Sequence, residues 1–248
     1  LSLGAIALAA PPKASGLLNW RGPDQTGVLP GAGFPEKWGG PGEEGHLWTY
    51  KVKGGGTPVI ANGKLYTFGY YDDPKDLSEV QEALICLDPE TGKLEWEYRF
   101  RDYISDVVYN RYAVGSPIVD AETGNIYMQG SNGRLMAFGE DGSKLWEHSL
   151  IEKLARLTFP NGRTGSLGLQ GPVVIVHCVT ANWGTTGPAR DRLYAFDKIT
   201  GELVWYSTPG TVPDDSSFAM PVYATIDGHR IGYTGHGCGN ITSVDMRT

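Results

Sequence analysis

The densest group of chemically reactive side chains in the sequence lies near its C-terminal end. The run Gly235–Asn240 (GHGCGN) places an imidazole and a thiol two residues apart in a glycine-rich turn. Both groups bind zinc, but a structural zinc site needs four ligands. A second pair, His177-Cys178, lies in an apolar run where successive side chains of a strand would face opposite ways. The first group is therefore interpreted as a hairpin turn with a buried cysteine, and neither pair as a complete metal site.

Two pairs of adjacent carboxylates, Asp72-Asp73 and Asp214-Asp215, are the next candidates for chemistry. Both stand in polar stretches, which favours solvated loop charge over acid–base catalysis. The sequence contains no Cys-Cys pair, no Cys-x-x-Cys-His haem motif and no Asp-x-Asp-x-Asp calcium loop. It also lacks a Gly-x-Ser-x-Gly elbow and a Walker-type phosphate loop. The sequence thus shows no catalytic site, and the protein is expected not to be an enzyme.

Composition narrows the class of protein further. The 248 residues include 35 glycines, 16 prolines and 11% aromatic residues, which is typical of a folded, turn-rich, all-β domain. The net charge of −7, without a Lys/Arg cluster, disfavours a nucleic-acid or anionic-membrane partner. Cys86, Cys178 and Cys238 allow at most one disulfide, and we expect them to be buried, small apolar side chains.

The N-terminal residues indicate export. Leu1–Ala10 (LSLGAIALAA) is apolar, contains an Ala-x-Ala pattern and is followed by Pro11-Pro12, as at the end of a signal peptide. An apolar N-terminal strand is the alternative. No later stretch reaches 18 uninterrupted apolar residues, so we expect no transmembrane segment in the mature chain. The predicted location is the periplasm or the extracellular space. Residues 11–45 are predicted to be a lead segment, and His46–Val52 is predicted to begin the first sheet.

Three segments of the chain repeat one pattern: Ala83–Trp96, Arg134–Trp146 and Arg192–Trp205. Each has a short apolar strand, a polar turn containing glycine, and then a tryptophan. Upstream of each lies a second pair of apolar stretches, as in Thr57–Ala61 and Lys64–Gly69, which Asn62-Gly63 joins in a strong hairpin signal. Four strands per unit, repeated along the chain, predict an all-β β-propeller of four-stranded blades.

The local chemistry of the first repeat supports a hairpin. Asp88 can accept hydrogen bonds from the amides that follow it, and Gly92 accepts the positive φ that closes the turn. Leu94–Phe100 then alternates apolar and charged residues, which predicts a strand with one buried face. In the second repeat the turn is one residue shorter.

Two stretches are expected to be insertion loops that carry binding contacts, Asp72–Glu82 and Ala181–Asp191. The last residues, Val244–Thr248, align with the start of the first repeat's turn, so the sequence stops in mid-motif. Residues 46–248 are therefore predicted to be a partial propeller, truncated to about half a ring, with three full repeats and one broken repeat.

At this point the repeats resemble a known family. Asp88–Trp96 (DPETGKLEW) and Asp197–Trp205 (DKITGELVW) resemble the tryptophan-docking repeats of PQQ-like β-propellers, which include the quinoprotein alcohol dehydrogenases. The run Trp20–Val28 (WRGPDQTGV) is similar to the opening of secreted bacterial members. The resemblance implies that one tryptophan per repeat packs against the neighbouring blade. The implied docking residues are Trp96, Trp146 and Trp205, with Gly92 and Gly201 in the turns.

The resemblance leaves several functions open. Quinoprotein dehydrogenases of this superfamily have an adjacent cysteine pair over the quinone, a Ca²⁺ site and a catalytic aspartate, so PQQ and Ca²⁺ are expected only if further blades supply their site. We expect an exported, non-catalytic scaffold that binds a protein partner or small ligand on one propeller face. The alternatives are a fragment of a PQQ-dependent alcohol or sugar dehydrogenase, and a sensor domain fused to other modules. Candidate binding residues at the channel mouth are Arg111, Arg163, Ser217 and His236.

Overall fold

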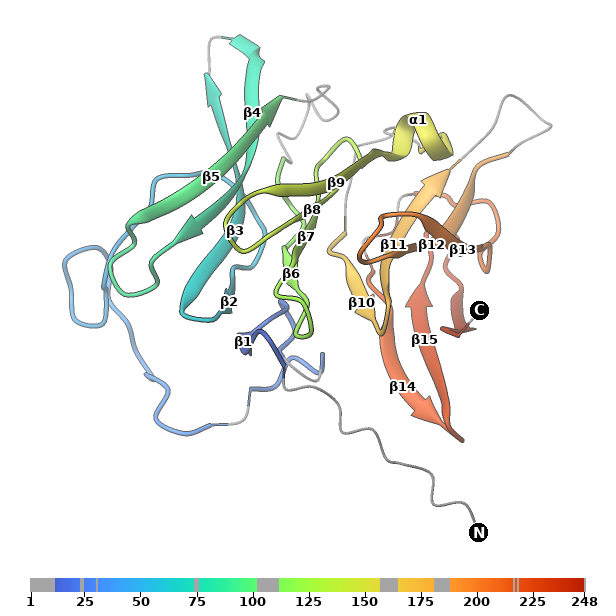
Figure 1. Ribbon diagram of the computed structural model, residues 1–248, viewed down its shortest axis with the longest axis horizontal. Coiled ribbons are helices and arrows are strands. Elements are labelled where there is room, and N and C mark those ends of the chain that lie inside the picture. Colours follow the sequence, from blue (N-terminus) through green and yellow to red (C-terminus); the bar gives the residue numbers. More distant parts are fainter. Residues whose placement is uncertain are drawn as a thin grey trace.

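Antiparallel strands in four consecutive sheets make up nearly all the regular structure (Figure 1). The computed structural model describes residues 12–22, 25–29, 31–73, 76–101, 112–156, 165–180, 188–215, 217 and 219–247. The first sheet has the order β1 (Gly16–Leu17), β2 (Val59–Ala61), β3 (Lys64–Asp73), β4 (Asp76–Leu87) and β5 (Leu94–Arg101). The second consists of β6 (Ile118–Val119), β7 (Ile126–Gln129), β8 (Arg134–Phe138) and β9 (Lys144–Ser149).

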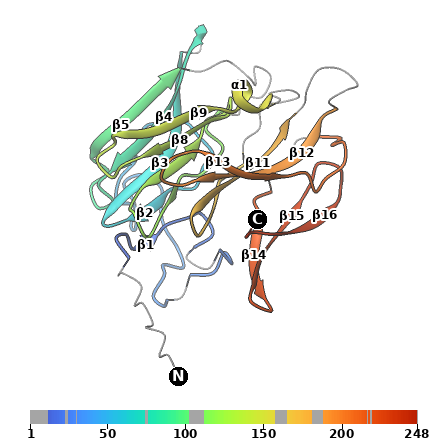
Figure 2. The same cartoon turned by 45° about the vertical axis from the view of Figure 1, so that its right-hand side comes forward.

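The third and fourth sheets complete the described part of the chain. The third sheet consists of β10 (Gly168–Gln170), β11 (Val173–Thr180), β12 (Arg190–Asp197) and β13 (Leu203–Ser207). The fourth consists of β14 (Val222–Ile226), β15 (His229–Gly235) and β16 (Ile241–Asp245). A short helix, α1 (Leu150–Leu154), follows the second sheet. The sheets follow one another in chain order across both views (Figures 1 and 2), which confirms the predicted partial β-propeller. Among the described residues, no helix is long and apolar enough to cross a membrane.

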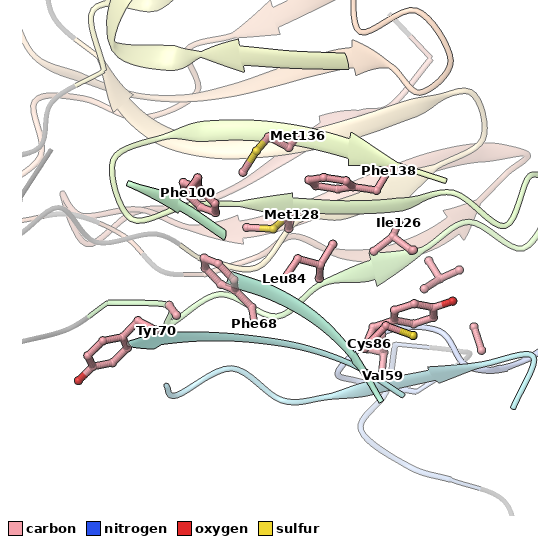
Figure 3. Packing of buried hydrophobic residues seen from close by; sticks show 14 of the residues in the cluster. Val59, Phe68, Tyr70, Leu84, Cys86, Phe100, Ile126, Met128, Met136 and Phe138 are labelled. Carbon is pink, nitrogen blue, oxygen red and sulfur yellow. The ribbon is translucent and has the colours of Figure 1, made fainter. Parts of the chain in front are cut away.

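Neighbouring sheets are held face to face by apolar side chains, as Figure 3 shows for the first two. Leu84 and Cys86 of β4 belong to the core shared with the second sheet, where Leu84 lies beside Met128, while Ile85 of the same strand packs in the cluster on the other face. A strand in the middle of such a stack is buried on both faces, so its sequence is apolar throughout. This explains why the repeats read as continuous apolar runs up to the turn.

The hairpins form where the sequence predicts them. Asn62 and Gly63 have φ values of 51° and 73° and close β2 onto β3 with the left-handed backbone of a tight turn. The Asp88 carboxylate accepts hydrogen bonds from the backbone N–H of Thr91 at 2.7 Å and of Glu90 at 3.0 Å. The turn of the second repeat is shorter by one residue, also as predicted. Its flanking strands pair Phe138 with Lys144, whereas the first repeat pairs Leu87 with Leu94.

Several predictions of local structure are wrong. The described residues of this stretch, 72–73 and 76–82, are not a loop, because β3 and β4 remain paired as far as Asp73 and Asp76. Asp72 is a strand residue that forms an ion pair with Lys53 at 2.7 Å. Asp191 was predicted to lie at the end of an insertion loop. It lies within β12 and is fully buried.

Two further predictions need correction. The run 46–52 was expected to begin the first sheet but is not a strand; its Trp48, Tyr50 and Val52 pack against the outer face of β4. Among the cysteines, which are all free, Cys86 and Cys178 are buried as expected, whereas Cys238 is partly exposed.

The lead segment contributes a fifth strand to the first sheet. β1 pairs with β2 through Gly16 and Ala61, and the N–H groups of Lys13 and Ala14 donate to the carbonyl of Ala121 in the second sheet. One segment thus contacts the inner strands of two successive blades.

Acid should weaken the hairpin turns. The side-chain hydroxyl and backbone N–H of Thr91 hold the pKa of Asp88 below its usual range, and this exposed carboxylate thus stabilises the folded state when charged. A depressed pKa contributes stability above the unfolded value of about 3.9, and the contribution is lost as the pH falls through the folded value. Asp88→Asn should be less stable than the parent at pH 7 and lose less on acidification. Thermal unfolding across the acidic range measures this, with Glu90→Gln as the control that should follow the parent.

Candidate ligand site between the third and fourth blades

At one end of the first and second interfaces between blades, an indole lies on the backbone of the next hairpin turn. Trp96 Nε1 donates to the carbonyl of Glu140 at 3.1 Å, and Trp146 Nε1 donates to that of Lys198 at 3.2 Å. The ring of Trp146 covers Gly201, where an added Cβ would stand 2.8 Å from Cδ2 of the ring. The turn therefore needs glycine for two reasons, its positive φ of 75° and the close approach of the indole.

The same contact occurs where sequence analysis missed it. Trp48 Nε1 donates to the carbonyl of Pro89 at 2.9 Å, and its ring covers Gly92. The signal was present in the spacing, because Trp48 precedes Trp96 by an interval close to that between Trp96 and Trp146. Trp205 packs in the cluster that joins the third sheet to the fourth.

The first and third interfaces have another contact, made by a buried carboxylate several residues along the strand from the turn. Glu82 of β4 accepts hydrogen bonds from the N–H groups of Ala113 at 2.7 Å and Ser131 at 2.9 Å, both from the next blade. Asp191 of β12 accepts one from the N–H of Gly237 at 2.9 Å, in the turn between β15 and β16. We call this contact the carboxylate clamp.

Two histidines surround the second of these carboxylates. Nε2 of His177, on β11, lies 2.8 Å from Oδ1 of Asp191, and Nδ1 of His236, in the β15–β16 turn, lies 3.3 Å from Oδ2. The two rings meet edge to face with their centroids 5.1 Å apart. The side chains are 2%, 0% and 0% exposed for His177, Asp191 and His236, respectively.

Each of the three side chains has a further polar contact that fixes its orientation. Nδ1 of His177 lies 2.7 Å from the carbonyl oxygen of Ala219, and Nε2 of His236 lies 2.6 Å from Oγ1 of Thr242. Burial alone would raise the pKa of Asp191, but the His177 imidazole and the Gly237 N–H outweigh it and hold this pKa below its usual range. Burial and the neighbouring His177 lower the pKa of His236.

The structure brings together two of the four predicted binding residues. Ser217 Oγ donates to the carbonyl of Gly235 at 2.8 Å and thereby anchors the turn that carries His236. Arg111 and Arg163 lie outside the described residues. Sequence analysis missed the grouping of His177 and Asp191 with His236, although it named both histidines. The available signal was the repeat register, because Asp191 precedes the turn aspartate Asp197 by the same interval that separates Glu82 from Asp88.

The described residues do not fit PQQ and its Ca²⁺. Cys86 lies in the core between the first and second sheets and Cys178 in the core between the second and third, so these thiols do not stand side by side. Among the described residues, the metal-ligating group found by geometry is His177, Asp191 and His236. It offers two nitrogens and one carboxylate, whereas Ca²⁺ takes about six to eight oxygen ligands.

Fold and interface contacts together define a partial β-propeller whose blades are joined by tryptophan docking. A family model described as "Outer membrane protein assembly factor BamB" matches residues 40–208. The chain belongs to this family of PQQ-like propeller repeat proteins. No curated protein matches the sequence significantly.

Solved structures with a similar arrangement include two dehydrogenases and a BamB protein. A europium-containing methanol dehydrogenase is 20% identical, with a TM-score of 0.48 over 67% of this chain and 27% of its own. BamB from Moraxella catarrhalis is 17% identical, with a TM-score of 0.45 over 81% and 55%. A quinohemoprotein alcohol dehydrogenase from Pseudomonas putida HK5 is 15% identical, with a TM-score of 0.44 over 81% and 43%. The chain thus spans between 27% and 55% of the length of these proteins.

A Cβ at Gly201, the glycine that the Trp146 ring covers, should lower the free energy of unfolding by more than the positive φ alone predicts. Gly201 and Gly63 have similar φ values of 75° and 73°, but a Cβ on Gly63 would meet no atom within 4 Å. Gly63→Ala should cost roughly 1–2 kcal/mol for the left-handed backbone alone. Gly201→Ala should cost more, because the Cβ also displaces the Trp146 ring. Chemical denaturation measures both, and equal losses would contradict the docking contact.

Removal of a docking indole should destabilise the fold as a core truncation does. Trp146→Ala is expected to lower the free energy of unfolding by about 3 kcal/mol, the low end for tryptophan, because the ring is only partly buried. The matched control is Trp38→Ala, since Trp38 is 75% exposed and should be replaceable at little cost. The contact is not structural if the Trp146 variant melts with the parent.

Proposed function

We propose that the protein is an exported, non-catalytic propeller of the periplasm that acts as a scaffold by binding a partner protein. The observation that carries the proposal is the uncharged outer strand of the third blade. β13 is the last strand in the order β10-β11-β12-β13, so one side of its backbone is an open edge of the sheet. An open edge can accept an extended segment of another protein as an additional strand.

The side chains of β13 differ from those of the other outer strands. Leu203, Val204 and Tyr206 are 42%, 56% and 63% exposed, and the strand has no charged residue. β5 has Glu95 and Glu97 next to its docking tryptophan, and β9 has Lys144 and Glu147. Charges on an edge strand oppose pairing with other chains, and their absence leaves β13 receptive to a partner.

Membership of the family supports a protein, rather than a small molecule, as the partner. The family description names an outer membrane protein assembly factor. A scaffold with this role acts in the periplasm, which agrees with the signal-peptide-like residues at the N-terminus. The match covers the first three blades, and its last matched residues lie at the end of β13.

The test gives β13 the charges that β5 already has. Val204→Glu together with Tyr206→Glu reproduces Glu95 and Glu97 on either side of the tryptophan, so the fold should tolerate the change. A photo-crosslinking residue placed at position 203 in the native host should yield a defined adduct with one outer-membrane or assembly protein. The adduct should be lost in the doubly charged variant.

The matched control is Leu145→Glu on β9, at a residue that is 48% exposed and also precedes a docking tryptophan. This control should leave the adduct from position 203 unchanged. The scaffold role is contradicted by equal loss of the adduct in the control, by no adduct at all, or by PQQ-dependent dye reduction in the purified protein.

A further inference from the structure

We propose that His177, Asp191 and His236 form a zinc site that joins the third and fourth blades. This site is separate from the β13 edge and does not depend on the scaffold role. The three ligand atoms come from three elements, β11, β12 and the β15–β16 turn, and all lie within 4.8 Å of one another. Two imidazoles and one carboxylate form a donor set suited to zinc and similar transition metals.

The atoms that converge lack other hydrogen-bond partners. Nε2 of His177, Oδ1 of Asp191 and Nδ1 of His236 are all buried, and none of them has a hydrogen bond of good geometry among the described residues. Buried polar atoms are nearly always satisfied, and a group of three unsatisfied atoms within 4.8 Å of one another needs an explanation. A cation between them satisfies all three at once.

The hydrogen-bond partner of Nδ1 identifies Nε2 as the ring nitrogen of His177 that is available to a metal. Its Nδ1 lies 2.7 Å from the Ala219 carbonyl oxygen, which can only accept, so Nδ1 carries the hydrogen. Nε2 is the other ring nitrogen, and it lies only 2.8 Å from Oδ1 of Asp191. The 3.3 Å between Nδ1 of His236 and Oδ2 of Asp191 matches the edge of a tetrahedron whose bonds are about 2.0–2.1 Å long, whereas the 2.8 Å at His177 is shorter than that edge.

The surrounding contacts are those of ligands held ready for a metal. Metal-binding histidines donate their other ring nitrogen to a carbonyl or a hydroxyl, which fixes the tautomer and the ring orientation. Here Nδ1 of His177 contacts the Ala219 carbonyl, and Nε2 of His236 contacts the Thr242 hydroxyl. The Asp191 carboxylate accepts a hydrogen bond from the Gly237 N–H. A Cβ on Gly210 would lie 3.1 Å from Nδ1 of His236, so a glycine there leaves space beside the ligand atoms.

The equivalent interface between the first and second blades shows that the clamp does not require histidines. Phe68 pairs with Leu84 on β4 as His177 pairs with Leu193 on β12, so Phe68 occupies the position of His177. Gly130 begins the β7–β8 turn as His236 begins the β15–β16 turn. A Cβ there would stand 3.0 Å from the Glu82 carboxylate. The two histidines are thus additions around a carboxylate that joins blades without them elsewhere.

Metal titration of the purified full chain, stripped with a chelator, tests the proposal. Zn²⁺ should bind with one equivalent per chain in competition with a chromophoric chelator, and should raise the melting temperature up to that ratio. Ca²⁺ and Mg²⁺ should do neither, because they prefer oxygen ligands. The absence of stoichiometric Zn²⁺ binding, or equal binding of Ca²⁺, overturns the proposal.

Variants taken from the other interface locate the metal. His177→Phe and His236→Gly install the residues found at the equivalent positions, and each should weaken Zn²⁺ binding at least about a hundredfold, since loss of an outer-shell partner alone costs 10–100-fold. His229→Ala is the matched control, because His229 also lies 2.9 Å from a carboxylate, that of Asp245, but is exposed. Unchanged Zn²⁺ affinity in a folded His177 or His236 variant contradicts the site.

A spectroscopic measurement on the parent decides the matter even if these variants fail to fold. Co²⁺ in the proposed site should give visible d–d bands without thiolate charge transfer. A charge-transfer band that disappears in Cys238→Ala would place the ion on the nearby thiol and overturn the proposal.

Discussion

The indole of one blade lying on a turn glycine of the next is the contact on which the remaining structure depends. Each sheet is small and exposes two apolar faces, so it is stable only when its neighbours cover both. Trp96 and Trp146 set the spacing of those neighbours, because their Nε1 groups donate to carbonyls in the following turn and their rings cover its glycine. The turn must therefore combine a positive φ with the absence of a Cβ.

The carboxylate clamp is a second kind of contact between blades, several residues along the strands from the turns. Asp191 precedes the turn residue Asp197 by six positions in β12, which corresponds to about 20 Å of extended chain. The first interface is joined at both ends, by Trp96 and by Glu82, and therefore resists rotation of one sheet against the next. There Glu82 accepts hydrogen bonds from two backbone amides and from the Ser131 hydroxyl, whereas at the third interface His177 and His236 surround the carboxylate. The blades thus share one architecture, and the two histidines are an additional feature of the third interface.

The sequence predicted the features that local chemistry determines. Asn62-Gly63 and Asp88–Gly92 specify their turns through φ and side-chain acceptors within a few residues, and both form as predicted. Contacts between distant segments were not accessible in this way. The docking of Trp48 depends on Pro89, which is 41 residues away. Asp72–Glu82 was interpreted as a loop because its side chains are mostly polar. The burial of Asp191 depends on Gly237, which is 46 residues away.

Native-state hydrogen exchange of the Ser131 and Gly237 amides tests most directly whether buried carboxylates join neighbouring blades. Turn amides ordinarily exchange fast, since local fluctuations open them readily. Because Glu82 and Asp191 accept these two N–H groups across an interface, both amides should be protected as strongly as those of the buried strands β8 and β12. Exchange of both at the rate of exposed turns would contradict the clamp and, with it, this account of how the propeller is held together.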